Sequence, residues 1–239
     1  MCKAARVSKS AQSKQRIDRT KSRKRFRSTL VAFYSLFREI RLRKTHIDLL
    51  QQTSFWHIFD AFLEKRVKFV KKFDEPSIRL ISQYNREDNM FSVGPHRMRI
   101  TRSDIALIFG IADGDRRINT NYTTKHASAF ISRRFANDAD LRTPVIRRAL
   151  VDAVGGKRKT DTIDTVRLLC LYLFTTILFS PGSDRLRWGY VNYVEDIKTI
   201  CDYDWSSAVV DELMNSVDKS NSEPWKVTGC ILALQVMLH

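Results

Sequence analysis

Residues 161–179 read DTIDTVRLLCLYLFTTILF and contain the most apolar stretch of the chain. Apolar residues recur in it at helical spacing, and Asp161 stands where a helix cap is expected. The apolar run Leu168–Phe179 spans twelve residues, well short of the roughly 20 that a membrane-spanning helix needs. We therefore predict a buried core helix over Ile163–Phe179 and expect no membrane partner.

Amphipathic patterns on both sides of this helix predict further helices. One starts after Ser54 as N-cap and is broken by Pro76. The last is apolar on nearly every side and is expected at the centre of the fold. Because it runs to the end of the chain, we expect a shortened gene product or a fragment. The predicted helices cover residues 30–40, 55–75, 102–109, 129–135, 145–154, 191–200, 205–217 and 227–238.

A hairpin and a helix cap are predicted between residues 90 and 110. Met90–Val93 and Arg97–Ile100 are strand-like runs joined by a Gly-Pro-His loop that contains Gly94. Thr101 can cap the next helix, because Asp104 follows at the third helical position in a variant of the capping box. Gly110 stands where a left-handed residue ends a helix. The predicted fold is mainly α: a single helical domain over 29–239 with a small β-hairpin near residues 90–100.

The charge of the chain is concentrated at its N-terminus. The 239 residues carry a formal net charge of +16, with a pI near 10.0. Residues 1–28 hold eleven Lys and Arg against one Asp, a net charge of +10, which leaves +6 for the other 211 residues. With almost no large apolar side chain, residues 1–28 cannot form a core, and we predict a disordered basic tail. Such a tail favours an acidic partner.

A short basic cluster lies within this tail and is typical of a nuclear-import signal. Contact with a phosphate backbone is compatible with that role, and such binding would be non-specific and salt-sensitive. A plain solvated tail is the alternative interpretation. We expect a nuclear protein with non-specific affinity for nucleic acid through the tail. The residues of this import and phosphate-contact candidate are Lys21, Arg23, Lys24, Arg25 and Arg27.

The sequence contains no pattern typical of a metal, cofactor or catalytic site. Its four cysteines and five histidines do not pair at metal-ligand spacing. Asp202 and Asp204 could form a carboxylate pair, but a helix cap at Asp204 and a surface acid at Asp202 explain them with less. Gly155-Gly156-Lys157 lacks the remaining residues of a phosphate-binding loop. We therefore predict no catalytic, cofactor-binding or metal-binding residue, and a protein that is not an enzyme.

Four pieces of the chain, in order, match the pattern of one plant family. They are FSVGPHRMRITRSDIALIFGIADG (91–114), the helix Leu168–Phe179, YVEDI (193–197) followed by YDWSSA (203–208), and the apolar stretch Gly229–Leu238. Residues 54–239 thus resemble the plant mobile domain family, also called aminotransferase-like plant mobile domain proteins, which are tied to transposable elements. The resemblance marks as structural motif positions Gly94, Thr101, Asp104, Gly110, Tyr193, Asp196, Tyr203 and Trp205.

The resemblance implies a nuclear protein of transposon origin, linked in some members to transposon silencing or control of gene expression. It does not imply transaminase activity. Our leading hypothesis is a non-enzymatic nuclear interaction domain that binds an unknown nuclear protein. One alternative is a DNA-binding module derived from a transposase. Trp188, Trp205 and Tyr203 with Arg185 and Arg187 could stack on bases, although we expect the tryptophans to pack in the core. Another is an enzyme fragment whose catalytic part is missing.

Overall fold

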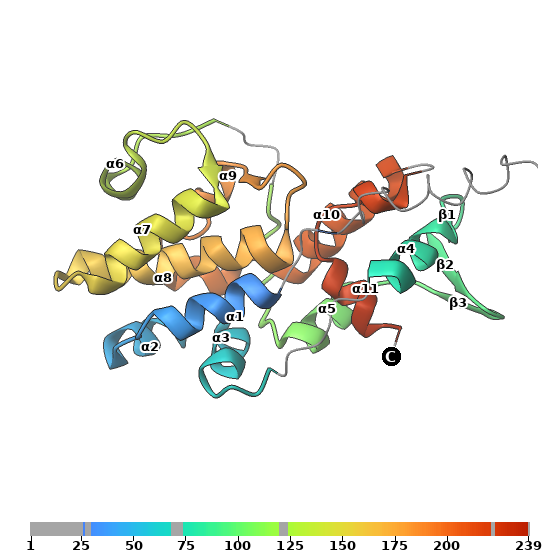
Figure 1. Cartoon of the computed structure of the whole chain (residues 1–239), viewed down its shortest axis with the longest axis horizontal. Coiled ribbons are helices and arrows are strands. Elements are labelled where there is room, and N and C mark those ends of the chain that lie inside the picture. Colours follow the sequence, from blue (N-terminus) through green and yellow to red (C-terminus); the bar gives the residue numbers. More distant parts are fainter. Residues whose placement is uncertain (1–25, 27–29, 68–73, 120–123, 221–222, 239) are drawn as a thin grey trace, which may run out of the picture.

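The computed structural model describes residues 26, 30–67, 74–119, 124–220 and 223–238. The fold is mainly helical with small antiparallel sheets, as predicted (Figure 1). None of the helices in the described part is long and apolar enough to cross a membrane. The α-helices are α1 (Leu30–Glu39), α2 (Lys44–Leu50), α3 (Trp56–Leu63), α4 (Asp74–Ser82), α5 (Arg102–Phe109), α6 (Ala129–Phe135), α7 (Thr143–Gly155), α8 (Lys159–Leu173), α9 (Gly189–Asn192), α10 (Trp205–Ser220) and α11 (Ile231–Val236).

The predicted hairpin is present and belongs to a three-stranded sheet, but its loop is only Gly94-Pro95, because His96 already pairs with Val93. Strands β2 (Met90–Val93) and β3 (His96–Met98) pair antiparallel, with Phe91 opposite Met98. A short strand, β1 (Tyr84–Asn85), pairs with the other edge of β2. Strands β4 (Leu141–Arg142) and β5 (Arg185–Leu186) form a separate antiparallel pair. The three-stranded sheet lies at one end of the molecule, and the turn between α7 and α8 lies at the other (Figure 1).

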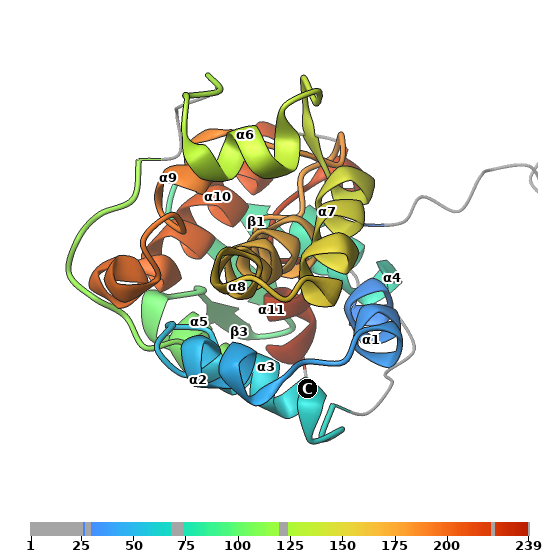
Figure 2. The same ribbon diagram turned by 90° about the vertical axis from the view of Figure 1, so that its left-hand side faces the viewer.

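Helix α8 is the centre of the fold, as its apolar sequence predicted. Helices α7 and α2 pack along it, and the view down its axis shows the other helices arranged around it (Figure 2). The chain then continues as a π-helical segment, η2 (Phe174–Leu178), in which the Phe179 amide donates to the Phe174 carbonyl at 2.9 Å. The predicted helix therefore extends to Leu178 but widens in its last turn.

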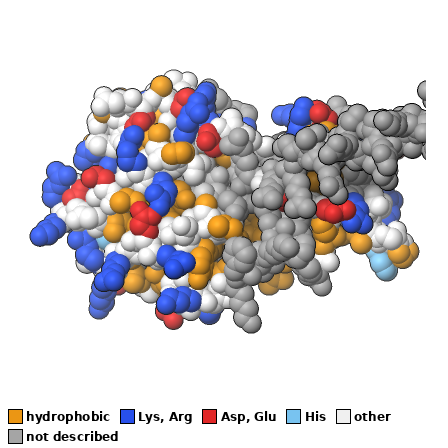
Figure 3. Space-filling view, viewed as in Figure 1, with side chains coloured by type: hydrophobic (Ala, Val, Ile, Leu, Met, Phe, Trp, Pro, Cys, Tyr) orange, Lys and Arg blue, Asp and Glu red, His pale blue; other side chains and the backbone are white. Residues whose placement is uncertain are grey.

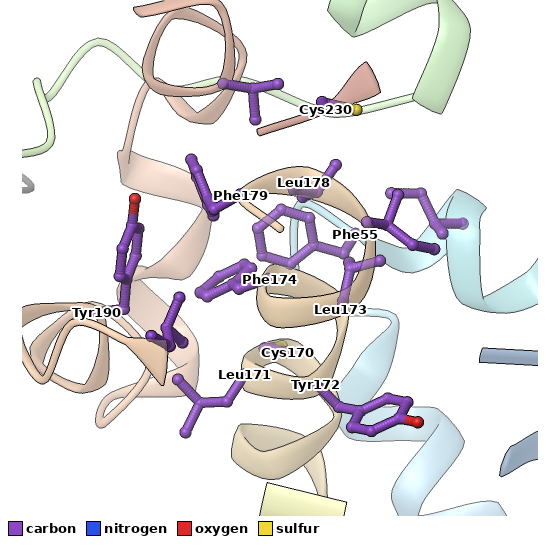
Figure 4. Close-up of a cluster of buried hydrophobic side chains, with 14 of the residues drawn as sticks. Phe55, Cys170, Leu171, Tyr172, Leu173, Phe174, Leu178, Phe179, Tyr190 and Cys230 are labelled. Atoms are coloured by element: carbon purple, nitrogen blue, oxygen red, sulfur yellow. The ribbon is translucent and has the colours of Figure 1, made fainter. Parts of the chain in front are cut away.

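The widened turn places Phe174 in an aromatic cluster (Figure 4). The Phe174 ring lies 5.3 Å from the Phe55 ring, 4.8 Å from Trp205 and 5.7 Å from Tyr190, measured between ring centroids. Phe174 and Trp205 have no measurable exposure. Residues far apart in the sequence thus meet around η2, and this cluster joins α3, α8 and α10 into one core.

The prediction of one helix from Ser54 to Pro76 is wrong in its extent. The N-cap of α3 is Phe55 and not Ser54, whose hydroxyl donates to the Ile200 carbonyl instead. Helix α3 ends at Leu63, and Lys65 has a positive φ of 55°, which a helix interior does not allow. Pro76 lies in the first turn of α4 and does not end a helix. A proline is tolerated there because N–H groups in the first turn have no intrahelical acceptor, so the missing N–H of proline breaks no helical hydrogen bond.

Two other predicted helices are shorter than expected. Within 191–200, α9 ends at Asn192, and Asp196 starts a 3₁₀ helix, η3 (Ile197–Asp202), by accepting a bond from the Lys198 amide at 3.0 Å. Within 227–238, Gly229 has a φ of 91° and passes close to the backbone of Leu213. This turn delays α11 until Ile231, so a 3₁₀ helix, η4 (Pro224–Lys226), and a turn precede it. Val236 of α11 is 45% exposed, so this helix is not central throughout its length.

The core includes a residue that we expected in the disordered tail. Phe26 is only 5% exposed and belongs to the buried apolar cluster. Burial of one aromatic ring stabilises a chain by about 2 kcal/mol or more, which favours packing of Phe26 against the body. The basic candidates Lys21, Arg23, Lys24, Arg25 and Arg27 lie outside the described residues.

Candidate functional site

The two motif stretches that are separated in the sequence meet in the structure. Helix α5 packs against α10, the Gly114 amide donates to the Tyr203 carbonyl at 3.0 Å, and the Ser206 amide donates to Asp113 Oδ1 at 2.9 Å. We call residues 101–116 and 193–206 together the motif junction. Gly94 is not part of it. That residue lies in the exposed hairpin turn with a φ of 57° and open space around it.

Helix α5 begins and ends as its sequence predicted. The Thr101 hydroxyl accepts a bond from the Asp104 amide, and Asp104 Oδ2 accepts one from the Thr101 amide at 2.8 Å. The reciprocal capping box is therefore confirmed. Gly110 ends the helix with a φ of 62°, and a Cβ atom at this position would lie 2.9 Å from the Cβ of His57. Thr101, Asp104 and Gly110 thus have structural roles.

The aromatic motif residues pack against one another in the junction. Trp205 is fully buried, and its indole N–H donates to the Ile200 carbonyl at 2.7 Å. The Tyr203 and Tyr193 rings lie edge-on to each other with centroids 5.0 Å apart, and the Tyr193 hydroxyl donates to the Asn119 carbonyl. A buried Trp205 cannot stack on a base, so the base-stacking alternative is wrong for this residue.

The carboxylates of the junction hold the backbone and an arginine. Asp204 Oδ1 accepts a bond from the Ser207 amide at 3.0 Å and so caps α10, as predicted. Arg102 lies 3.4 Å from Asp113 and 3.3 Å from Asp204. Asp202 is exposed and pairs with Arg116. In the part of the chain that the structure describes, no group of three or more potential ligands could hold a metal ion.

Burial makes two of the thiols unreactive. Cys170 and Cys230 have no measurable exposure, and desolvation of the thiolate raises the pKa of Cys230 to about 12. Burial also raises the pKa of Cys170. The Cys201 thiol is partly exposed and donates to the Gln52 carbonyl at 3.2 Å. A nucleophile needs its thiolate near neutral pH, so the two buried thiols are unsuited to that role.

An ion-pair network that we did not predict connects α6 to α8. Asp164 has a fully buried side chain and accepts bonds at 3.0 Å from Arg133 and Arg134. Arg134, with 6% of its side chain exposed, also lies 2.6 Å from Asp161. We call these residues, with Arg167 beside Asp164, the Arg–Asp network. The Arg-Arg pair at 133–134 and the two Asp of α8 were visible in the sequence, but their pairing was not.

The network also shapes the turn between α7 and α8. Asp161 Oδ2 accepts a bond from the Arg158 amide at 3.0 Å, and the bonds from Arg158 and Arg134 lower the pKa of Asp161 to about 2. Its carboxylate fits against Gly156, where a Cβ atom would lie 2.4 Å from it. The turn is therefore held closely against a buried charge network, and three consecutive cations follow Gly156, namely Lys157, Arg158 and Lys159.

These three cations are part of a larger basic surface. The segment from the end of α1 into α2 carries four more, and both segments lie at the same end of the helical bundle (Figures 1 and 2). Lys and Arg side chains project from this end in the space-filling view (Figure 3). We call this surface the basic end. All of its cations are exposed: Arg38, Arg41, Arg43, Lys44, Lys157, Arg158 and Lys159.

A buried histidine holds the backbone of one segment of the basic end. His46 has no measurable exposure, and its Nδ1 accepts a bond from the Arg43 amide at 3.1 Å. Burial disfavours the imidazolium, and so does the adjacent Arg43 cation. Together they lower the pKa of His46 from 6.5 to about 4. The folded protein thus keeps His46 neutral at a pH at which the unfolded chain protonates it.

We expect the pKa of His46 to make the protein less stable as pH falls from about 6.5 to 4. In this window the unfolded chain binds one proton more than the folded protein, so the free energy of unfolding rises with pH. The effect is at most about 3 kcal/mol, since one pKa unit corresponds to about 1.4 kcal/mol. Urea unfolding at several pH values should give a flatter dependence for His46→Gln than for the unchanged chain. Parallel curves would contradict this assignment.

The structure also contains a polar cavity of about 310 Å³ beside the C-terminal half of α10. It is lined by residues that already pair with one another. Arg187 lies 3.2 Å from Glu212, and Lys226 lies 2.5 Å from Glu223. With charges of both signs and no unpaired set of ligands, the cavity indicates no particular small molecule.

Comparison with known proteins identifies a family but no activity. A family model described as Domain of unknown function (DUF8566) matches residues 65–235. That range includes the motif junction, the Arg–Asp network and the α7–α8 turn. No curated protein and no solved structure matches the chain.

Proposed function

This chain belongs to the family Domain of unknown function (DUF8566), whose description gives no activity, and we propose that it is a non-enzymatic nuclear interaction domain. In this proposal the helical body binds a nuclear protein partner. The basic tail provides nuclear import and loose affinity for nucleic acid. The resemblance to plant mobile domain proteins supports an origin in a transposon, and a link to transposon silencing or gene-expression control.

The main support for this proposal is that the carboxylates of the motif junction are engaged in holding the fold together. Asp104 and Asp204 cap helices, and Asp113 accepts a backbone bond and faces Arg102. Catalysis by a carboxylate needs an oxygen that can reach a substrate. These carboxylates instead hold two sequence segments together, which supports a scaffold more than an enzyme.

The tail gives the most direct test. A fluorescent reporter too large for passive nuclear entry is fused to the full chain and imaged in plant cells. Neutralising the import candidate with Lys21→Gln, Arg23→Gln, Lys24→Gln, Arg25→Gln and Arg27→Gln is expected to abolish most nuclear accumulation. Import receptors recognise clustered cations, and this change removes the cluster.

A matched control removes the same charge from the start of the tail. Lys3→Gln, Arg6→Gln, Lys9→Gln, Lys14→Gln and Arg16→Gln neutralise five dispersed cations and leave the cluster intact. This variant is expected to remain nuclear. If both variants accumulate in the nucleus like the unchanged chain, or if the unchanged chain stays in the cytoplasm, the nuclear assignment is wrong.

A further inference from the structure

The basic end combines two features that a binding surface for a polyanion needs. Its seven cations come from two segments, 38–44 and 157–159, and all are exposed. Arg38, Arg41 and Lys44 form no ion pair within the described residues, and neither do Lys157 and Lys159, so their charges are available to a partner. Lys and Arg gathered on one end of a domain create a positive potential that attracts polyanions.

Acidic residues do little to cancel this charge. The only acid within 38–44 and 155–160 is Glu39, which pairs with Arg147 of α7. Asp161 is 4% exposed and accepts bonds from Arg134 and Arg158, so it is hidden behind the turn. Asp152, one turn before Gly155, pairs with Arg134. Asp152 and Asp48, one turn after Lys44, are exposed acids beside these segments, but the seven cations outnumber them. The net charge at the basic end is therefore positive.

The start of α8 lies within the basic end. The helix is 15 residues long and begins at Lys159, within the basic end. The N-terminus of a helix carries a partial positive charge from its aligned peptide dipoles, which favours anions in its vicinity. Asp161 in the first turn already places a carboxylate at this N-terminus, where it accepts a bond from the Arg158 amide. Attraction of a further anion therefore comes from the exposed cations themselves.

The two segments are also held rigidly, which lowers the entropic cost of binding. Asp161 fixes the α7–α8 turn through Arg158 and Gly156. His46 fixes the start of α2 through the backbone of Arg43. Cations mounted on well-packed segments lose less conformational freedom on binding than cations on a disordered tail.

The composition of the basic end distinguishes between kinds of nucleic acid. Segments 38–44 (REIRLRK) and 157–159 (KRK) contain no aromatic residue. Single strands are bound largely by stacking of bases on aromatic rings, whereas a duplex presents two rows of phosphates to Lys and Arg. We propose that the basic end contacts the phosphate backbone of duplex DNA. This goes beyond the proposed function, in which only the tail contacts nucleic acid.

The test uses the full chain and changes three cations that make no ion pair. The variant Arg41→Gln, Lys157→Gln, Lys159→Gln removes one charge from the first segment and two from the second. Its dissociation constant for a short duplex of arbitrary sequence is measured by fluorescence anisotropy across a salt series. Each lost phosphate contact lowers the slope of log affinity against log salt by about 0.9, so we expect a decrease of about 2 to 3. At near-physiological salt we expect an affinity loss of about ten-fold or more.

A control with the same change in net charge separates contact from general attraction. Arg117→Gln, Lys198→Gln, Lys219→Gln neutralises three exposed cations that lie outside the basic end. Both triple variants are also made in a chain whose tail cluster is neutralised, so that the tail cannot mask the body. We expect the basic-end variant to lose affinity in both backgrounds and the control to keep its salt slope. Circular dichroism and thermal unfolding verify that every variant is folded.

Three results would overturn the proposal. One is an equal loss for the basic-end variant and the control, since this would indicate net charge alone. Another is loss of all duplex affinity on neutralising the tail, since the body then contributes nothing. The third is binding to vesicles that contain phosphatidylserine, at the same salt, that exceeds duplex binding and depends on the same three cations. That result would assign the basic end to a membrane surface. Failure of nuclear import is measured separately and leaves this test unaffected.

Discussion

Asp164→Asn is expected to lower the free energy of unfolding by about 3 to 5 kcal/mol, the usual cost of breaking a buried ion pair. The Asp164 side chain is fully buried, and it accepts bonds from Arg133, Arg134 and Arg167. The asparagine keeps the shape of the side chain but removes the negative charge. Arg134, with 6% of its side chain exposed, then loses part of its compensation in a place that water hardly reaches.

A second partner of the same arginine provides the control. Asp152 lies 2.6 Å from Arg134, but 76% of its side chain is exposed. Solvent screens this pair, so Asp152→Asn is expected to cost less than about 1 kcal/mol. Urea unfolding followed by circular dichroism measures both variants under the same conditions. Similar costs for the two would mean that the network is not a buried electrostatic unit.

Trp205→Ala is expected to destabilise the protein by about 3 to 5 kcal/mol, as large-to-small changes of buried aromatic residues do. Trp205 is fully buried, and its ring lies 5.0 Å from Phe55 and 4.8 Å from Phe174. The change leaves a cavity where α3, η2 and α10 meet. It also leaves the Ile200 carbonyl without the indole N–H that lies 2.7 Å away.

Trp205→Phe is a milder change at the same position and tests the same packing. Phenylalanine keeps an aromatic ring in the cluster but removes the indole hydrogen bond and part of the volume, so we expect a smaller loss than for alanine. Thermal unfolding of the two variants gives the order. If Trp205→Ala unfolds at the temperature of the unchanged chain, Trp205 is not a centre of the motif junction. The base-stacking hypothesis for this residue would then need to be reconsidered.

Local features were predicted well from the sequence. The capping box of Thr101 and Asp104 depends on residues three apart, and the left-handed Gly110 depends on the residue itself. Helix α6 was predicted with its observed limits, Ala129–Phe135, because apolar spacing along a helix is a local signal. The core position of α8 followed from an apolar run with helical spacing that is too short to span a membrane.

Features that depend on contacts between distant segments were not predicted. The Arg–Asp network joins residues about 30 positions apart, and no spacing rule relates Arg133 to Asp164. The basic end joins residues more than 100 positions apart, so it became visible only when α1, α2 and the α7–α8 turn were placed together. Pro76 was misinterpreted because a proline can end a helix or lie in the first turn of the next one. The residue alone does not show which of the two applies.

We propose that this chain acts in the nucleus by electrostatic contact as well as through a protein partner. Stepwise salt extraction of isolated nuclei that contain the tagged full chain tests it most directly. We expect the chain in the nuclear fraction, with release that increases as salt rises. The basic-end variant should be released at lower salt, and the Arg117, Lys198 and Lys219 control should follow the unchanged chain. A chain that stays in the cytoplasm, or whose release does not depend on salt, would contradict this account.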